Sequence, residues 1–398
     1  ATIIRLPLRK APRWCASVHT FSEKEYKEHF IPYNYYMTIK FNIGLGTFRF
    51  FLAFLVAISH LWENMIGGPA AYAVWGFFVL SGFLMTLILT TKYGFTKQGI
   101  QNYAHNRILR IYPSYILGCI FGITLLLILN GTDTTVLNPA YKMPTQFCYY
   151  VHNILMLPLP TDGLFVPVAG ALFVEFWAYA LMIFAAKSKS AAWLGLIITL
   201  FTNIHYGFSP DTFPERYSFF TPSICGFFVG SLCVHYYQKI KCFIYPKTSL
   251  IVWCLHAMLS LKWEGYPWTY GLYTSLVCSA WVIISLYPIK TGKADKLFGD
   301  MSYIVYLIHT TIGMCFWWNY KERSFLFFLI TFIITVFISY IWVILFERPL
   351  QKRFKRNIMP RKNVLGAWAT IIRLPLRKAP RWCASGRTFS EKEFRWVL

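Results

Sequence analysis

The sequence predicts an all-α integral membrane protein that forms one polytopic bundle of about ten transmembrane helices. Apolar residues make up 56% of the 398 residues and charged residues only 14%, whereas about a quarter of the residues of a soluble protein are charged. Apolar runs long enough to cross a bilayer recur along the chain, and Lys and Arg lie in short clusters between them. This composition excludes disordered, collagen-like and disulfide-stapled secreted proteins.

Ten apolar segments have the length and hydropathy of candidate membrane spans when the chain is scanned with a window of about 19 residues. They cover residues 46–64, 71–91, 111–130, 166–186, 191–206, 217–237, 249–262, 269–288, 302–319 and 324–346. The longest connection, residues 131–165, is rich in turn-forming sequences such as NGTD and LPLPTDG. No soluble domain is expected between the segments.

The charges between these segments predict the orientation of the bundle. The chain holds 39 Lys and Arg against 16 Asp and Glu, a net charge of +23. Leaving the two terminal extensions aside, most basic residues fall in alternate connections, namely residues 92–110, 187–189, 239–247, 290–296 and 348–356. Because cytoplasmic loops of membrane proteins are enriched in Lys and Arg, these connections and both termini are predicted to be cytoplasmic. Basic residues distributed in this way do not predict a nucleic-acid partner.

The two ends of the chain carry a direct repeat. Residues 1–17 (ATIIRLPLRKAPRWCAS) recur without change as residues 369–385, and the first Met is Met37. We therefore expect residues 1–36 and 367–398 to be non-native extensions of a membrane domain spanning residues 37–366. The alternative is that both copies are basic amphipathic arms that bind the inner leaflet.

Two ionisable residues, Arg49 and His60, lie within the first apolar segment. Ionisable side chains in hydrocarbon cost several kcal/mol, so they are candidates for function. Eleven positions on an α-helix return to nearly the same face, about 16 Å further along the axis. The two side chains are expected to line one path across the membrane. The alternative is a snorkelling Arg at the inner edge and an interfacial His at the outer edge.

The second segment and the connection after it hold further candidates. Gly76, Ser81 and Gly82 interrupt an aromatic run and would permit close packing of helices. Arg107 and Arg110 lie three positions apart on one helix face, a fork suited to phosphate groups. A bare pair of charges at this place could equally anchor the topology.

Polar residues also occur in the fourth and ninth segments. Glu175 has no charged neighbour in the sequence, so it must be protonated, paired or facing a cavity. Ser302, Tyr306 and His309 follow the spacing i, i+4, i+7 and form a polar stripe on an apolar helix. Such a stripe could hold helices together or belong to a site. The ten Cys contain no CxxC pair, so neither a zinc site nor a disulfide framework is expected.

The motifs described above, in this order along the chain, resemble those of the acyltransferase 3 family of bacterial inner-membrane O-acyltransferases. Arg49 and His60 match its R-x10-H motif, FFVLSGFL matches its second-helix signature, and the RILR segment of Arg107 and Arg110 with IYPSY matches its RxxR-IYP segment. Glu175 matches the family glutamate, SYIVYLIH the late SYsiYLxH motif and FERPLQKRFK the closing E-x-P motif. The resemblance covers residues 44–355.

The resemblance implies transfer of an acetyl group from cytoplasmic acetyl-CoA to a hydroxyl of a cell-surface or lipid-linked glycan, such as lipopolysaccharide. His60 would be the general base, with Arg49 and Glu175 as the other catalytic residues. Arg107 and Arg110 would hold the phosphates of CoA. The expected partners are acyl-CoA, the glycan acceptor and membrane lipid, without a metal.

The remaining polar residues of the second and ninth segments, Ser81, Ser302, Tyr306 and His309, are expected to support the substrate or the structure.

Two other functions remain open at this point. A transporter or flippase could use His60, Glu175 and His309 as a proton relay, although the two halves show no inverted repeat that would favour it. A non-enzymatic membrane scaffold leaves the shared face of Arg49 and His60 unexplained.

Overall fold

The structure, a computed structural model, describes residues 43–62, 67–263 and 265–358. Within these ranges every regular element is helical, which confirms the predicted all-α class. The terminal repeats lie outside the described residues. The elements are α2 (Leu45–Leu61), α3 (Gly67–Ile88), η1 (Leu89–Tyr93), α4 (Lys97–Ile128), α5 (Phe147–Leu155), α6 (Ala169–Lys187), α7 (Lys189–Tyr206), η2 (Pro210–Thr212), α8 (Phe213–Ser218), α9 (Phe220–Ser223), α10 (Cys225–His235), α11 (Tyr237–Ile240), η3 (Lys241–Phe243), α12 (Pro246–Leu259), η4 (Tyr266–Trp268), α13 (Tyr270–Leu286), α14 (Lys293–Tyr320), α15 (Phe325–Trp342), η5 (Val343–Glu347) and α16 (Arg348–Ile358).

Among the described residues, four helical stretches are long and apolar enough to cross a bilayer: α3 with η1, α4, α6, and α15 with its continuation. The number rises to six if each of two bent pairs is one span. One pair bends by 87° before α9 and α10, and the other by 82° before α12. The shorter helix α2 has 17 residues, about 26 Å of helix, against a hydrocarbon core of about 30 Å. The predicted count of ten spans is therefore not confirmed.

Apolar side chains on the outside of the bundle indicate contact with lipid. Only 28% of the most apolar window of α15 is buried, against 83% for α3. Along α7 the side chains of Leu194, Ile197, Phe201 and Ile204 are exposed. A helix that is apolar on its outward face matches hydrocarbon and not water, so the chain is a membrane protein.

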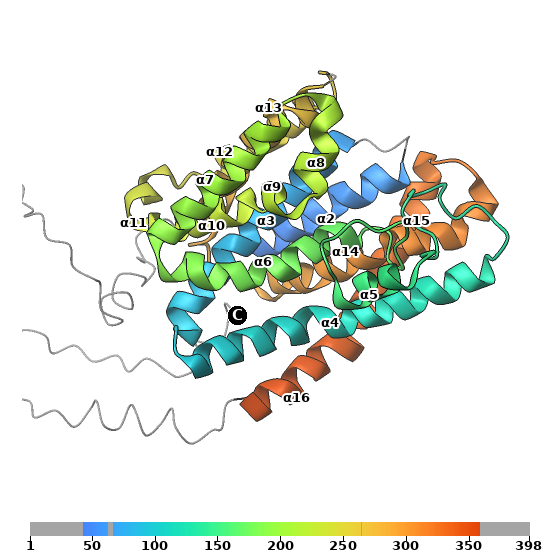
Figure 1. The fold of residues 1–398 in the computed structure, drawn as a ribbon, viewed down its shortest axis with the longest axis horizontal. Helices are drawn as coiled ribbons and strands as arrows, with labels where there is room; N and C mark the ends of the chain where they lie inside the picture. The colour runs from blue at the N-terminus through green and yellow to red at the C-terminus, as the bar shows by residue number, and fades with distance from the viewer. Residues whose placement is uncertain (1–42, 63–66, 264, 359–398) are drawn as a thin grey trace, which may run out of the picture. The chain divides into compact units, whose positions relative to one another are not determined.

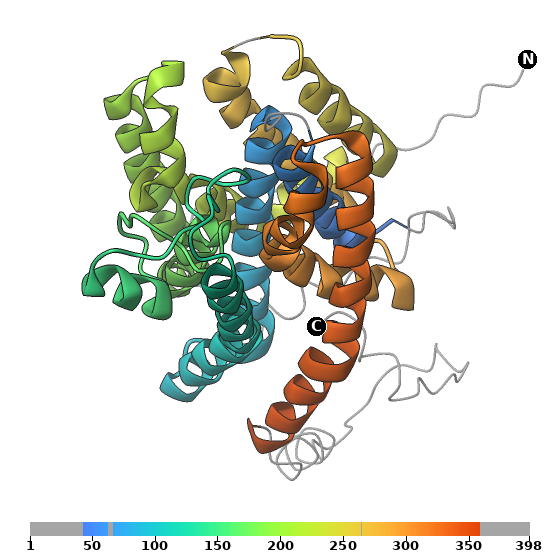
Figure 2. The same cartoon turned by 90° about the vertical axis from the view of Figure 1, so that its right-hand side faces the viewer.

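The buried helix α3 packs against α2, α6, α10 and α13. Figure 2 shows it, in light blue, between the green helices on one side and the orange helices on the other. Glycines bring its backbone against α10: a Cβ atom at Gly82 would lie 2.1 Å from the carbonyl oxygen of Phe227, and one at Gly230 would lie 2.0 Å from that of Val79. The small residues of the second segment therefore serve close packing, as the sequence predicts.

The N-terminus of α2 is fixed by a residue of α14. Asp295, in the first turn of α14, accepts hydrogen bonds from the backbone N–H groups of Gly44, Gly46 and Thr47, at 3.0, 3.2 and 2.7 Å. These N–H groups have no partner within their own helix. The contact sets the position of α2 along α14.

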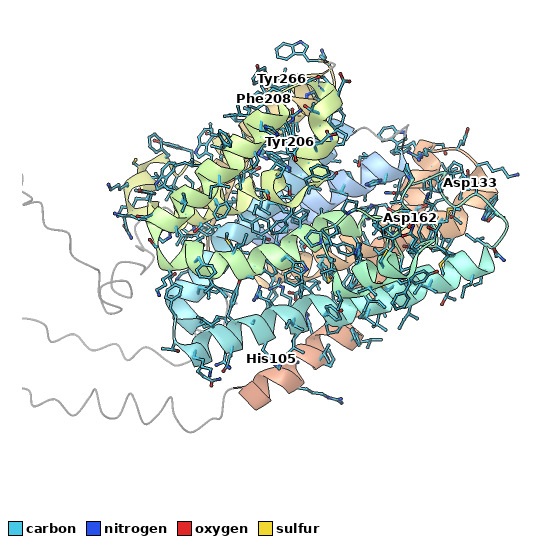
Figure 3. All side chains as sticks on the ribbon, viewed as in Figure 1. His105, Asp133, Asp162, Tyr206, Phe208 and Tyr266 are labelled. Atoms are coloured by element: carbon cyan, nitrogen blue, oxygen red, sulfur yellow. The ribbon has the colours of Figure 1, made fainter. Side chains whose placement is uncertain are left out.

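Residues 131–165 form an ordered connection that includes α5 and packs on α4. The side chain of Asn153 holds it together: Nδ2 donates to the carbonyl oxygens of Tyr149 and Gly163, and Oδ1 accepts from the N–H of Phe165. The hydroxyl of Tyr115 on α4 donates to the carbonyl oxygen of Asn153 at 2.8 Å. Figure 3 labels Asp133 and Asp162 of this connection on the side of the C-terminal half of α4, and His105 in the N-terminal half of that helix.

Candidate active site

Helices α2 and α14 bring together the polar residues of the first and ninth predicted segments. The two helices lie against each other (Figure 1). Arg49 of α2 shares a cavity with Ser302 and Tyr306 of α14. Further along the same helices, the ring centres of His60 and His309 are 5.4 Å apart. The face of α2 that carries Arg49 and His60 is thus turned toward the polar stripe of α14.

The cavity beside Arg49 lies between α2, α3, α6 and α14. Its volume of about 30 Å³ admits a water molecule or two. A guanidinium and a carboxylate border this space, and the other walls are mainly apolar and aromatic. Electrostatic interactions in such a site are stronger than in water. The lining residues are Arg49, Val74, Phe77, Phe78, Ala171, Leu172, Glu175, Ser302, Tyr303 and Tyr306.

Glu175 is held by two hydroxyl groups from different parts of the chain. Its Oε1 accepts hydrogen bonds of 2.5 Å from Oγ of Ser81 and from the hydroxyl of Tyr179. Of the three possibilities that the sequence left for Glu175, the structure shows a residue that is both hydrogen-bonded and facing a cavity. Ser81 is the residue that links α3 to it.

Arg107 points into the protein. Its guanidinium carbon lies 6.0 Å from the ring centre of Tyr103 and 5.9 Å from that of Tyr179, and its Nη2 donates to the side chain of Asn106 at 2.6 Å. The side chain is 8% exposed. Arg107 therefore contacts Tyr179, whose hydroxyl donates to Glu175, and Glu175 in turn lines the cavity.

Arg110 has a different environment from Arg107. It is half-buried and interacts electrostatically with Arg49 and with Glu347. Glu347, which ends the π-helical turn η5, accepts a hydrogen bond of 3.1 Å from Oγ of Ser114. Arg110 is thus the more accessible of the two arginines, and it lies between the cationic end of α2 and an acid.

Three acids that the sequence analysis did not select contribute to this region. Asp295 positions α2, Glu347 interacts with Arg110, and Asp300 forms an ion pair of 2.9 Å with Arg348. Of these three acids, only Glu347 could have been identified from a sequence motif, because it is the glutamate of the FERP sequence. The partners of Asp295 and Asp300 lie more than 40 residues away, so no local pattern could indicate them.

The histidine pair has a defined hydrogen-bond arrangement on one side. Nδ1 of His309 lies 3.0 Å from the carbonyl oxygen of Val305 and 2.8 Å from that of Tyr306. The ring centre of Tyr306 is 6.3 Å from that of His309. Glu63, three residues after His60 in the sequence, lies outside the described residues. From Ser302 at the cavity to His309 is about 10 Å along the helix.

Comparison with known proteins settles the family. A family model described as an acyltransferase domain matches residues 42–344, well over half of the chain. The chain belongs to the acyltransferase 3 family. The comparisons with curated proteins and with solved structures gave no match.

Membership in the acyltransferase 3 family makes the protein a membrane acyltransferase. The matched range includes both polar centres, the cavity of Arg49 and Glu175 and the histidine pair. Glu347 lies three residues beyond its end. The acyltransferase domain therefore runs from α2 through α15 and includes the helices α2, α3, α4, α6 and α14 that build both centres.

Proposed function

We propose that this acyltransferase moves a short acyl group, acetyl, from cytoplasmic acyl-CoA to a hydroxyl of a cell-surface or lipid-linked glycan in the bacterial inner membrane. The observation that carries the proposal is the arrangement on α2 and α14. Arg49, which borders the cavity, and His60, which belongs to the histidine pair, lie about 16 Å apart along one face of α2 inside a membrane acyltransferase. This arrangement would allow the acyl donor to bind from one side of the membrane and the acceptor from the other.

We place the acyl-CoA donor at the end of the site that holds Arg49 and Arg110. Arg110 is half-buried beside Arg49, and a guanidinium binds phosphate groups through paired N–H donors. Arg49 would bind negatively charged groups of the donor inside the membrane. Acetyl is proposed as the acyl group because the resemblance to the family implies it.

His60 is the proposed general base. The acceptor oxygen forms a bond to the acyl carbon, the carbon–sulfur bond breaks, and His60 takes the hydroxyl proton while CoA leaves as a thiolate that is then protonated. A sugar hydroxyl is a weak nucleophile, so removal of its proton in the transition state contributes about 10²- to 10⁴-fold to the rate.

The test is acetyl transfer from labelled acetyl-CoA to membrane glycans by the full chain in lipid vesicles. We expect His60→Ala to lower the rate by about 10²- to 10⁴-fold. His205→Ala is the matched control, because His205 is exposed on α7, away from both centres. A normally inserted and fully active His60→Ala protein would overturn the role of His60. Absence of transfer together with glycan movement across the vesicle membrane would favour a transporter.

A further inference from the structure

Two buried ring nitrogens of the histidine pair have no hydrogen-bond partner. They are Nδ1 of His60 and Nε2 of His309, and they belong to rings whose centres are 5.4 Å apart. Nearly all buried polar atoms in proteins have a partner. The two unpartnered atoms lie on facing residues of the two helices that form the site, so each is the natural partner of the other.

The hydrogen bonds of His309 decide which of its nitrogens carries the proton. Nδ1 faces two carbonyl oxygens, those of Val305 and Tyr306. Carbonyl oxygens only accept hydrogen bonds, so Nδ1 must be the N–H of the neutral ring. Nε2 then holds a lone pair and can only accept.

We infer that His309 is a positioning residue that fixes the tautomer of His60. Nε2 of His309 accepts a hydrogen bond from Nδ1–H of His60, and this leaves the lone pair of His60 on Nε2, where it can take the proton of the acceptor hydroxyl. A ring nitrogen lies about 1.2 Å from its ring centre, so two nitrogens that point at each other across this gap are about 3 Å apart, a hydrogen-bond distance. In the structure the two nitrogens do not yet form this bond, so the inference requires the two rings to turn toward each other.

His309 and Arg323 are the described titratable groups that interact electrostatically with His60. Of these two, the guanidinium of Arg323 has no acceptor, whereas Nε2 of His309 has one. Backbone carbonyl groups orient His309, and His309 in turn orients His60. This is the arrangement of a general base that is held in place by a further group. The identity of His60 as the base rests on the proposed function; its tautomer does not.

Two substitutions at position 309 separate positioning from packing. In His309→Gln the amide oxygen can reach the place of Nε2 and accept from His60. In His309→Asn the shorter amide reaches only the place of Nδ1, so it can bond the carbonyl oxygens of Val305 or Tyr306 but offers His60 nothing. Both changes remove the imidazole, and they differ in the acceptor that faces His60.

The first measurement is turnover with acetyl-CoA. We expect kcat to fall roughly tenfold or more in His309→Asn, as for loss of a hydrogen bond at a reacting group, while KM for acetyl-CoA changes less than about twofold. His309→Gln should recover most of kcat. Equal losses of kcat in the two variants would overturn the inference.

The second measurement needs no turnover. Nitrogen NMR of the ¹⁵N-histidine-labelled full chain in lipid nanodiscs reports the tautomer of each ring, and His60 is assigned by its absence in His60→Gln. At a pH where both rings are neutral, we expect His60 to carry its proton on Nδ1 in the wild type and in His309→Gln, and to become a mixture in His309→Asn. A wild-type His60 protonated on Nε2 overturns the inference even if His309→Asn does not fold. The expected tautomer without acetyl transfer would instead reject the proposed function alone.

Discussion

Oδ1 of Asp295 accepts two hydrogen bonds of 2.7 Å from Thr47, one from its backbone N–H and one from its hydroxyl. Thr47 is in the first turn of α2 and Asp295 in the first turn of α14. Arg49 follows two residues after Thr47. The contact therefore fixes the position along α14 of the α2 face that carries Arg49 and His60. The pairing of Arg49 with the cavity and of His60 with His309 depends on that register.

Loss of this contact should disturb both stability and activity. We expect Asp295→Ala to lower the free energy of unfolding by about 1–3 kcal/mol, since it removes a helix cap and hydrogen bonds to a carboxylate. Activity should fall as well, because α2 can shift along α14. Thermal unfolding and acyl transfer in vesicles measure the two effects. The control Asp300→Asn breaks a partly exposed ion pair and should cost at most about 1 kcal/mol. An unaltered unfolding midpoint in Asp295→Ala would contradict the assigned role.

The proposed orientation can be tested with two native cysteines. Cys148 and Cys242 are both exposed. Cys148 lies in the connection predicted to be outside and Cys242 in one predicted to be cytoplasmic. A membrane-impermeant thiol reagent should label Cys148 in intact cells and Cys242 only after the membrane is opened, as detected by mass spectrometry of the peptides. The reverse pattern would remove the cytoplasmic donor site.

The two arginines of the RILR segment should respond differently to substitution. Arg110→Gln is expected to raise KM for acetyl-CoA by roughly 10- to 150-fold, since a hydrogen bond to a charged group contributes about 1.5–3 kcal/mol. It should have little effect with acetyl-pantetheine, which lacks the CoA phosphates. Arg107→Gln should mainly lower thermal stability, because Arg107 is buried against Tyr103 and Tyr179. A similar loss of Arg110→Gln with both donors would show that Arg110 does not bind phosphate.

Close packing of α3 and α10 should make Gly82 intolerant of a side chain. In Gly82→Ala the new methyl group would lie 2.1 Å from the carbonyl oxygen of Phe227, so we expect a loss of about 1–3 kcal/mol from overpacking. Gly170→Ala on α6 is the matched control: nothing lies within 4 Å of the new Cβ, and the change should stabilise the protein by about 0.4–1 kcal/mol. Thermal unfolding in detergent distinguishes the two. Equal midpoints would disprove the close approach.

Lowering the pH should break the hydrogen bonds between Thr145 and Asp162 in the 131–165 connection. The hydroxyl and N–H of Thr145 donate to this carboxylate and lower its pKa below the usual 3.8. Because the folded pKa is lower than the unfolded one, the stabilisation is complete above the unfolded pKa and disappears as the pH falls through the folded pKa. We expect the protection of the Thr145 amide against hydrogen exchange to fall at a higher pH in Thr145→Val than in the wild type. Thr145→Ser keeps the hydroxyl and should behave like the wild type.

The number of membrane spans shows where sequence patterns reach their limit. An apolar window detects each run but not its bend. The break of 87° falls within the predicted segment 217–237, and the break of 82° lies just before the predicted segment 249–262. Whether a run of this kind spans the bilayer depends on how it packs, and hydropathy alone carries no information on that.

The sequence by itself determined the helical class, the membrane setting and the family. It also placed Arg49 and His60 on one face of α2, since helical periodicity is a local property. Only the tertiary structure decided that this face meets His309 and that Ser81 donates to Glu175 from 94 residues away. It also decided that Arg107 is buried between tyrosine rings while Arg110 is not. The physical reason is that these pairings depend on how helices far apart in the chain are placed against one another, through contacts such as that of Asp295 with Thr47.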